Sequence, residues 1–142
     1  MSQFRALAQS QLDSLAHEPG VKGAMLVSRD GLPILTSGRL GDGGMVAAMS
    51  ATMLGAAEMA IPDPAPLRVC IDAEKMRLLA VPATRDTLLV VLGDLETSAD
   101  DQMGLATAAG DAIAHATTPT VSAPASAKIN WVQEPARKQF SR

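Results

Sequence analysis

Residues Gly43 to Ile61 have the sequence GGMVAAMSATMLGAAEMAI, and this stretch decides the fold. It predicts a helix, and because no charged side chain occurs between Gly43 and Ala57, that helix lacks a strongly polar face. A helix that is apolar all round is normally buried on both sides. Since a single small domain can cover only one of those sides, we expect a partner to cover the other.

The residues before this helix contain a helical pattern, a strand hairpin and a glycine-rich loop. Apolar residues recur at helical spacing in the first segment, and an Arg-Asp-Gly turn separates the two short apolar runs that follow. Asp42, near the end of the loop, is expected to cap the central helix. The predicted segments are a helix at Ser2–His17, strands at Gly23–Ser28 and Leu32–Thr36 with the turn Arg29–Gly31 between them, and the loop Gly38–Gly44.

The residues after the central helix begin with a proline-rich break, which cannot continue a helix. Three apolar runs joined by short turns follow, and then a helical pattern with acidic residues in its first turn. The predicted segments are the break Pro62–Pro66, strands at Leu67–Asp72, Met76–Val81 and Thr87–Leu92, and a helix from Asp100 or Asp101 to Ala116. Because the last of these strands is apolar throughout, it is expected to lie centrally with both faces covered.

The order of these segments is helix, two strands, helix, three strands, helix. Consecutive strands joined by short turns pair in antiparallel fashion. The pattern αββαβββα therefore predicts an α+β fold, with a five-stranded antiparallel sheet and helices on its faces. One domain is expected at residues 1–117, because the chain has 142 residues and residues 118–142 have the composition of a flexible tail.

Three pieces of the sequence together resemble the roadblock/dynein light chain family, whose fold is roadblock/profilin-like. They are VKGAMLVSRDGLPI (Val21–Ile34), AAMSATMLGAAEMA (Ala47–Ala60) and RLLAVPATRDTLLVVL (Arg77–Leu92). The resemblance extends from about Phe4 to Ala116. It implies a homodimer in which the central helices pack together and the third strands pair, so that the two sheets become continuous.

The same resemblance implies a function. Members of this family bind or regulate Ras-like small GTPases, or act as scaffolds, and they contribute no catalytic residues of their own. The expectation is a non-enzymatic homodimeric regulator of a Ras-like GTPase of the polarity or motility type. Arg29, Arg39 and Arg85 lie in predicted loops and are candidates for a residue inserted into that GTPase. The alternative is an adaptor module that dimerises without affecting GTP hydrolysis.

The residues expected at the dimer or partner interface lie on the central helix and on the strand after it. Methionine side chains suit such a surface because they are unbranched and polarizable. Ser50, Thr52 and Glu58 are the helix residues expected to reach solvent. Trp131, the single tryptophan, is the expected contact of the tail, since tryptophan is enriched among binding hot spots. The interface residues are Met45, Met49, Ser50, Thr52, Met53, Ala56, Glu58, Leu67, Val69 and Ile71.

Composition argues against several other classes of protein. The net charge is −3 and only 2% of the residues are aromatic, which does not favour nucleic-acid binding. The uncharged run is too short to span a bilayer, so no membrane insertion is expected. A single cysteine, Cys70, and the lack of a signal-peptide pattern at the N-terminus fit the cytoplasm.

Two sequence patterns that form nucleotide-binding or catalytic sites in other proteins are incomplete in this sequence. The loop at 38–44 has the first two glycines of a phosphate-binding loop, but Gly44 and Met45 replace its lysine and its hydroxyl residue. A catalytic pair would need Cys70 as the nucleophile and His17 or His115 as the base. The middle of a strand, where Cys70 is predicted to lie, is not a typical position for such a nucleophile. We therefore expect no cofactor, no metal and no small-molecule substrate.

Overall fold

The computed structural model of the chain describes residues 2–61 and 68–117. Its elements follow the predicted order αββαβββα, and three of its strands differ from their predicted bounds by two residues. The elements are α1 (Ser2–Ala16), β1 (Val21–Ser28), β2 (Pro33–Gly38), α2 (Gly43–Ala60), β3 (Val69–Asp72), β4 (Arg77–Pro82), β5 (Thr87–Gly93) and α3 (Ala99–Thr117).

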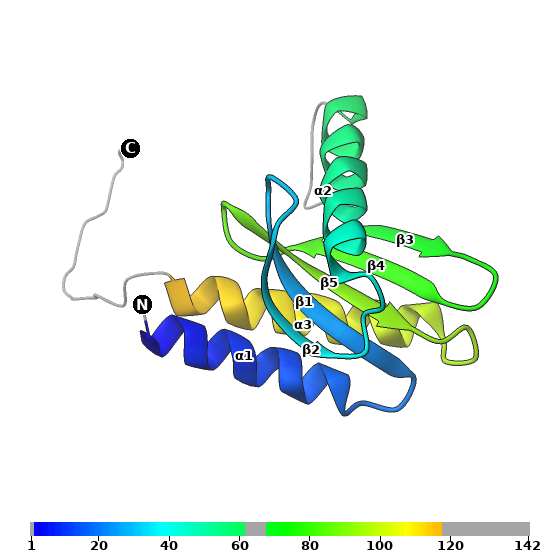
Figure 1. Cartoon of the computed structure of the whole chain (residues 1–142), viewed down its shortest axis with the longest axis horizontal. Helices are drawn as coiled ribbons and strands as arrows, with labels where there is room; N and C mark the ends of the chain where they lie inside the picture. Colours follow the sequence, from blue (N-terminus) through cyan, green and yellow to red (C-terminus); the bar gives the residue numbers. More distant parts are fainter. Residues whose placement is uncertain (1, 62–67, 118–142) are drawn as a thin grey trace, which may run out of the picture.

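The five strands form one antiparallel sheet in the order β2-β1-β5-β4-β3. The continuously apolar strand β5 is central, as predicted, and β2 and β3 lie at the two edges. Helices α1 and α3 run antiparallel to each other against one face of the sheet, and α2 stands on the opposite face (Figure 1). The predicted α+β fold with helices on both faces is confirmed.

Each face of the sheet has its own apolar core, because successive strand residues point to opposite faces. On β5, Leu89 and Val91 pack with α1 and α3, whereas Leu88 and Val90 pack beneath α2. The core under α1 and α3 contains more buried residues than the core under α2. The two helices thus bury one face thoroughly, and α2 alone covers only part of the other.

The boundaries of three strands differ from the prediction by two residues, and those of β4 and β5 differ by one. Strand β1 begins two residues earlier, at Val21, because Gly93 of β5 pairs with it there. Strand β2 is Pro33–Gly38 instead of Leu32–Thr36, since pairing with β1 continues to Gly38. Strand β3 begins at Val69, and Leu67 lies outside the described residues.

The predicted turn between β1 and β2 is confirmed, and it touches α2. Gly31 has a φ of +91°, a backbone conformation that residues with a side chain rarely adopt. A Cβ at this position would lie 3.1 Å from Cα of Ala48 on α2. The turn therefore needs glycine both for its backbone conformation and for its close approach to the helix.

Candidate interaction surface

Helix α2 begins where the sequence predicts and ends one residue earlier, at Ala60. The Asp42 carboxylate accepts a hydrogen bond from the backbone N–H of Met45 at 3.1 Å, which confirms the predicted N-cap. Ala47, Ser50 and Leu54 are the buried residues of this helix, and their spacing places them on the side that faces the sheet. The cap and this narrow buried stripe fix which side of α2 faces outward.

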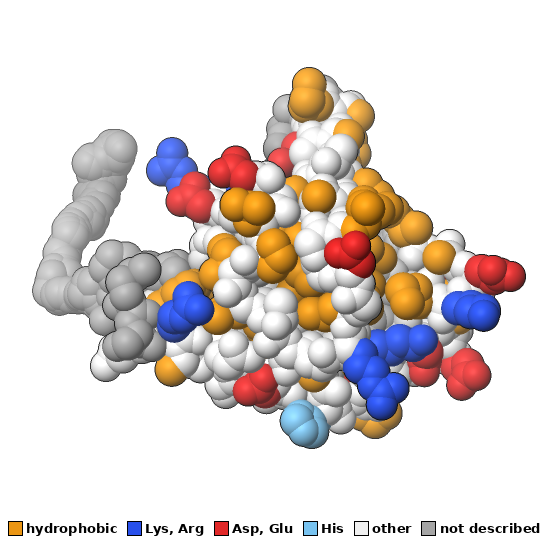
Figure 2. Space-filling view, viewed as in Figure 1, with side chains coloured by type: hydrophobic (Ala, Val, Ile, Leu, Met, Phe, Trp, Pro, Cys, Tyr) orange, Lys and Arg blue, Asp and Glu red, His pale blue; other side chains and the backbone are white. Residues whose placement is uncertain are grey.

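The outward side of α2 is apolar and exposed. Met45 is 57% exposed and Met49 is 49% exposed, and one helical turn separates them. At helical spacing, Thr52, Met53 and Ala56 lie on the same side, and among them Met53 is half-buried. Figure 2 shows apolar side chains along α2 and around its base. Five of the predicted interface residues therefore share one surface, which we call the α2 outer face: Met45, Met49, Thr52, Met53 and Ala56.

Two other predicted interface residues on α2 do not belong to this face. Ser50 is fully buried, so the expectation that it reaches solvent is wrong: it shares the sheet-facing side with Ala47 and Leu54. Glu58 is half-exposed, but its carboxylate accepts hydrogen bonds from Nη1 of Arg29 at 2.9 and 3.0 Å. Glu58 therefore anchors α2 to the β1–β2 turn.

Strand β3 supplies the second part of the candidate surface. Within the described part of the chain it pairs with β4 alone, which leaves one edge of its backbone unpaired. The register pairs Val69 with Ala80, which packs in the core under α2, so Val69 and Ile71 lie on the α2 side. Ile71 is 38% exposed. An unpaired edge with apolar residues is a template for pairing with another strand.

A shallow hollow lies on the α2 outer face. It has a volume of about 240 Å³ and is lined by Ala48, Met49, Thr52 and Met53. The Thr52 hydroxyl already donates to the backbone carbonyl of Ala48 at 2.9 Å. The lining is otherwise apolar, so the hollow offers packing contacts to another protein surface and few groups that would orient a small polar ligand.

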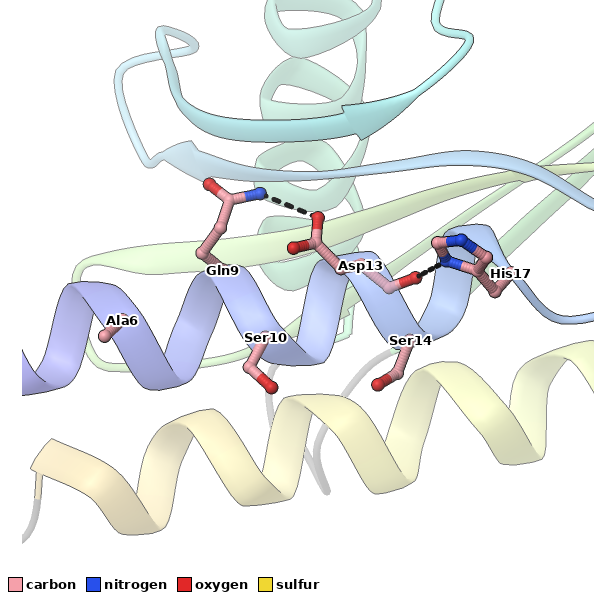
Figure 3. A pocket seen from close by; sticks show the side chains of 6 residues that line it. All are labelled: Ala6, Gln9, Ser10, Asp13, Ser14 and His17. Atoms are coloured by element: carbon pink, nitrogen blue, oxygen red, sulfur yellow. Dashed lines mark hydrogen bonds between the residues drawn. The ribbon is translucent and has the colours of Figure 1, made fainter.

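A larger hollow, of about 630 Å³, lies along α1 and is lined by residues of that helix and by His17 just after it (Figure 3). Gln9 donates to the Asp13 carboxylate at 3.0 Å, and the Ser37 hydroxyl donates to the same carboxylate at 2.7 Å. Nδ1 of His17 lies 2.7 Å from the backbone carbonyl of Asp13. These polar groups are hydrogen-bonded to one another and to the neighbouring strand β2 at the exposed surface of α1, so the arrangement does not resemble a substrate site.

The residues weighed for catalysis lie apart in the fold. Cys70 is exposed on the edge strand β3, His17 follows α1, and Nδ1 of His115 lies 2.8 Å from the carbonyl of Asp111 within α3. Among residues 2–61 and 68–117, no group of three or more His, Cys, Asp or Glu side chains is placed to hold a metal ion. Trp131, the predicted tail contact, lies outside the described residues.

A polar cluster at the start of β4 was not predicted from the sequence. Arg77, 6% exposed, binds the Asp72 carboxylate through Nε at 2.6 Å and donates through Nη1 to the Gln102 side chain at 3.0 Å. Gln102 is fully buried and donates to the carbonyls of Gly20 and Asp94 at 3.1 Å each. The cluster thus connects the end of edge strand β3 to the first turn of α3.

One sequence signal could have revealed this cluster. Gln102 occupies a position at helical spacing from Ala106, Ala109 and Ile113, all of which are buried on the sheet-facing side of α3. A polar residue in an otherwise apolar stripe needs a buried hydrogen-bond partner. The sequence alone does not say where that partner lies, because Arg77 is 25 residues away.

The ion pair between Arg29 and Glu58 gives the first testable prediction. Both side chains are about one-third exposed, so water screens their interaction. A double-mutant cycle with Arg29→Ala and Glu58→Ala should give a coupling free energy of about 0.2–1 kcal/mol, decreasing with added salt. Urea unfolding of the four proteins measures it, with the exposed neighbour substitution Asp30→Ala as the control. A coupling that is zero at low salt would show that the contact does not hold α2 in solution.

The acidic side chains Asp13, Asp72 and Asp94 give the second prediction. The N–H of Thr97 lowers the pKa of Asp94, Arg77 lowers that of Asp72, and the Ser37 hydroxyl lowers that of Asp13, each from the ordinary value of 3.8. The unfolded chain therefore takes up protons at a higher pH than the folded chain. Their stabilisation is present above the unfolded-state pKa, and it is lost as the pH falls through the lower folded-state values.

Urea midpoints measured between pH 7 and pH 3 test this prediction. Asp94→Asn removes one of the three contributions, so the variant should be less stable than the parent at pH 7 and should lose less stability on acidification. Asp30→Asn, on the exposed β1–β2 turn, serves as the control and should follow the parent curve. If Asp94→Asn and the parent lose equal stability on acidification, the lowered pKa of Asp94 does not contribute to stability as predicted.

A known protein family matches most of this domain. Residues 7–93 match the family model of the Roadblock/LC7 domain, which amounts to more than half of the chain. The comparison with curated proteins gave no match. No helix in the described part of the chain has the length and apolar character needed to cross a membrane.

Solved structures share the fold at low sequence identity. Gliding protein MglB from Thermus thermophilus has a TM-score of 0.70 at 18% identity, covering 79% of this chain and 89% of that chain. An MglB with a tetrameric arrangement has a TM-score of 0.71 at 18% identity, covering 79% and 88%. Profilin IA from Acanthamoeba castellanii has a TM-score of 0.56 at 16% identity, covering 78% and 98%. The roadblock/profilin-like fold is thereby confirmed.

Proposed function

The chain belongs to the Roadblock/LC7 domain family, and from this membership we propose that it is a homodimeric, non-catalytic regulator or scaffold of a Ras-like small GTPase. The observation that carries the proposal is the α2 outer face, together with an edge strand, β3, whose residues Val69 and Ile71 lie on the same side of the sheet. A protomer that keeps two half-exposed methionines on one helix has an apolar surface that suits a partner. Its single cysteine, Cys70, fits a cytoplasmic location.

The first step of the proposal is self-association. The α2 outer faces of two copies pack together, and the two β3 strands pair along their free edges, so that two five-stranded sheets join. Pairing satisfies the backbone groups along the β3 edge, and helix packing covers Met45 and Met49. The MglB structure with a tetrameric arrangement has the same fold, which supports self-association of roadblock-type chains.

The second step is action on the GTPase. Hydrolysis of GTP depends on how the GTPase orients the attacking water and stabilises the developing charge. A dimer that binds the switch loops can shift them toward or away from the competent arrangement. Of the three arginines that are candidates for insertion, Arg29 is held by Glu58, whereas Arg39 and Arg85 are exposed. The latter two are the better candidates for contacts with the nucleotide site.

Rates of GTP hydrolysis and of nucleotide exchange test the regulator role. Ras-like GTPases from the same organism are each loaded with GTP and mixed with the full chain, with Arg39→Ala and Arg85→Ala tested in parallel. A changed rate with one of these GTPases supports the proposal. If hydrolysis and exchange are unchanged for all of them, the regulator role is wrong.

The second candidate function is an adaptor that dimerises and recruits other proteins without affecting GTP hydrolysis. The observation that favours it is that the α2 outer face offers packing contacts and no catalytic groups. A pull-down with the full chain distinguishes the two functions. Partners that lack a GTP-binding fold, together with unchanged GTP turnover, would favour the adaptor.

A further inference from the structure

The layer formed by α1 and α3 contains a groove on the opposite side of the sheet from α2. It has a volume of about 180 Å³, smaller than the roughly 300–1,000 Å³ of typical small-molecule sites. Leu15 of α1 and Leu105, Ala108 and Ala109 of α3 supply its apolar lining. Ala108 is exposed, so the groove is open to solvent. Its size and lining suit a single large apolar side chain.

The surroundings of this groove are acidic. Glu18 lines it, and α3 carries Asp100, Asp101 and Asp111, all exposed. Helix α3 contains no lysine or arginine. By helical spacing, Asp101 lies on the same side of α3 as Leu105 and Ala108. A basic segment with an apolar anchor therefore has complementary charge at this surface.

The C-terminal segment of the same chain has this chemistry. Residues 118–142 carry four basic residues and one acidic residue, a net +3, whereas the whole chain has −3, so residues 1–117 carry −6. Within the segment, Trp131 lies close to two apolar residues, Ile129 two positions before it and Val132 directly after it. Tryptophan provides a large apolar surface together with a polar N–H group.

The length of the connection allows this segment to reach the groove. Helix α3 ends at Thr117, and the fourteen residues from there to Trp131 can span up to about 46 Å when extended. The groove residues Leu105 and Ala109 precede the end of α3 by roughly 12–18 Å of helix length. The chain can therefore turn back along α3 with length to spare.

We propose that the C-terminal segment docks on its own domain, with Trp131 in the groove between α1 and α3 and the basic residues beside the acidic side of α3. The hollow on α2 is a poorer site, since Glu58 of the same helix is already paired with Arg29. The hollow along α1 is poorer as well, because its carboxylate, Asp13, is already hydrogen-bonded. Docking on α1 and α3 leaves the α2 outer face free for the second copy.

Fluorescence of Trp131 tests the proposal in the full chain, because it is the single tryptophan. A docked indole should emit at shorter wavelength and be quenched less by acrylamide than it is in urea. Ala108→Lys places a positive charge in the groove at an exposed helical position, where it opposes both the indole and the basic segment, and should raise the quenching constant several-fold. Ala73→Lys, in the exposed β3–β4 turn, is the matched control and should leave quenching unchanged.

Three results would contradict docking of the segment in this groove. A Trp131 that is quenched in the native chain as strongly as in urea would overturn the proposal. Protection that Ala108→Lys leaves intact would overturn it too, because the segment would then dock elsewhere. Protection that arises only after a GTPase is added would assign the segment to that partner instead. A rise in quenching at high salt, seen in the parent and absent in Ala108→Lys, supports the charge complementarity.

Discussion

Met49→Asp is expected to convert the proposed dimer into a folded monomer. In the protomer Met49 is 49% exposed, so an aspartate there stays hydrated and the domain still folds. In the proposed helix-helix contact the same carboxylate would be buried without a partner, which costs several kcal/mol. A loss of about 3 kcal/mol weakens dimerisation by roughly a hundredfold or more. Sedimentation equilibrium measures the mass, and circular dichroism checks the fold.

Leu7→Asp provides the matched control for this experiment. Leu7 is 40% exposed and lies on α1, on the opposite side of the sheet from α2. The same charge is introduced at a similar exposure, so this variant should keep the mass of the parent. If Met49→Asp also keeps it while remaining folded, the α2 outer face is not the dimer contact. A loss of dimer in both variants would indicate a general effect of the added charge.

Much of the fold follows from local features of the sequence. The uncharged run at 43–57, the capping aspartate before it and the Arg-Asp-Gly turn each lie within one continuous stretch of the chain. Such signals are readable in sequence because the residues that cause them are close together along the chain. The central place of β5 also follows from its own composition, since a strand with two apolar faces must be covered on both.

Local sequence features do not determine which side chains of α2 are buried. An almost uniformly apolar helix does not reveal which side faces the sheet, so the burial of Ser50 was not predictable from periodicity. The pairing of Glu58 with Arg29 depends on where the β1–β2 turn lies in space. That some apolar residues of this helix are exposed was predictable, because a helix with apolar residues on every side cannot bury all of them in one small domain; that they include Met45 and Met49 is known only from the structure.

Gln102→Leu is expected to cause a larger loss of stability than either Arg29→Ala or Asp94→Asn. The change removes a buried side chain whose amide donates to Gly20 and Asp94 and accepts from Arg77. Leucine has a comparable size but leaves the Asp94 carbonyl and one Arg77 N–H without this partner. Gly93 packs so closely that a Cβ there would lie 2.5 Å from Nε2 of Gln102, so the cluster has little room to rearrange.

The expected loss in the free energy of unfolding is about 2–4 kcal/mol, which lowers Tm by roughly 10 °C. Gln9→Leu is the matched control: Gln9 also makes two hydrogen bonds, to Asp13 and the Thr36 carbonyl, but at the exposed surface. Its loss should stay below about 1 kcal/mol, because water replaces the missing partner. Parent and variants must be compared at one protomer concentration, since the proposed dimerisation would add to apparent stability. If both substitutions cost the same, the cluster does not tie β3 and β4 to α3 in solution. Strand β3, the edge strand proposed to pair with a second copy, would then be held in place by its hydrogen bonds to β4 alone.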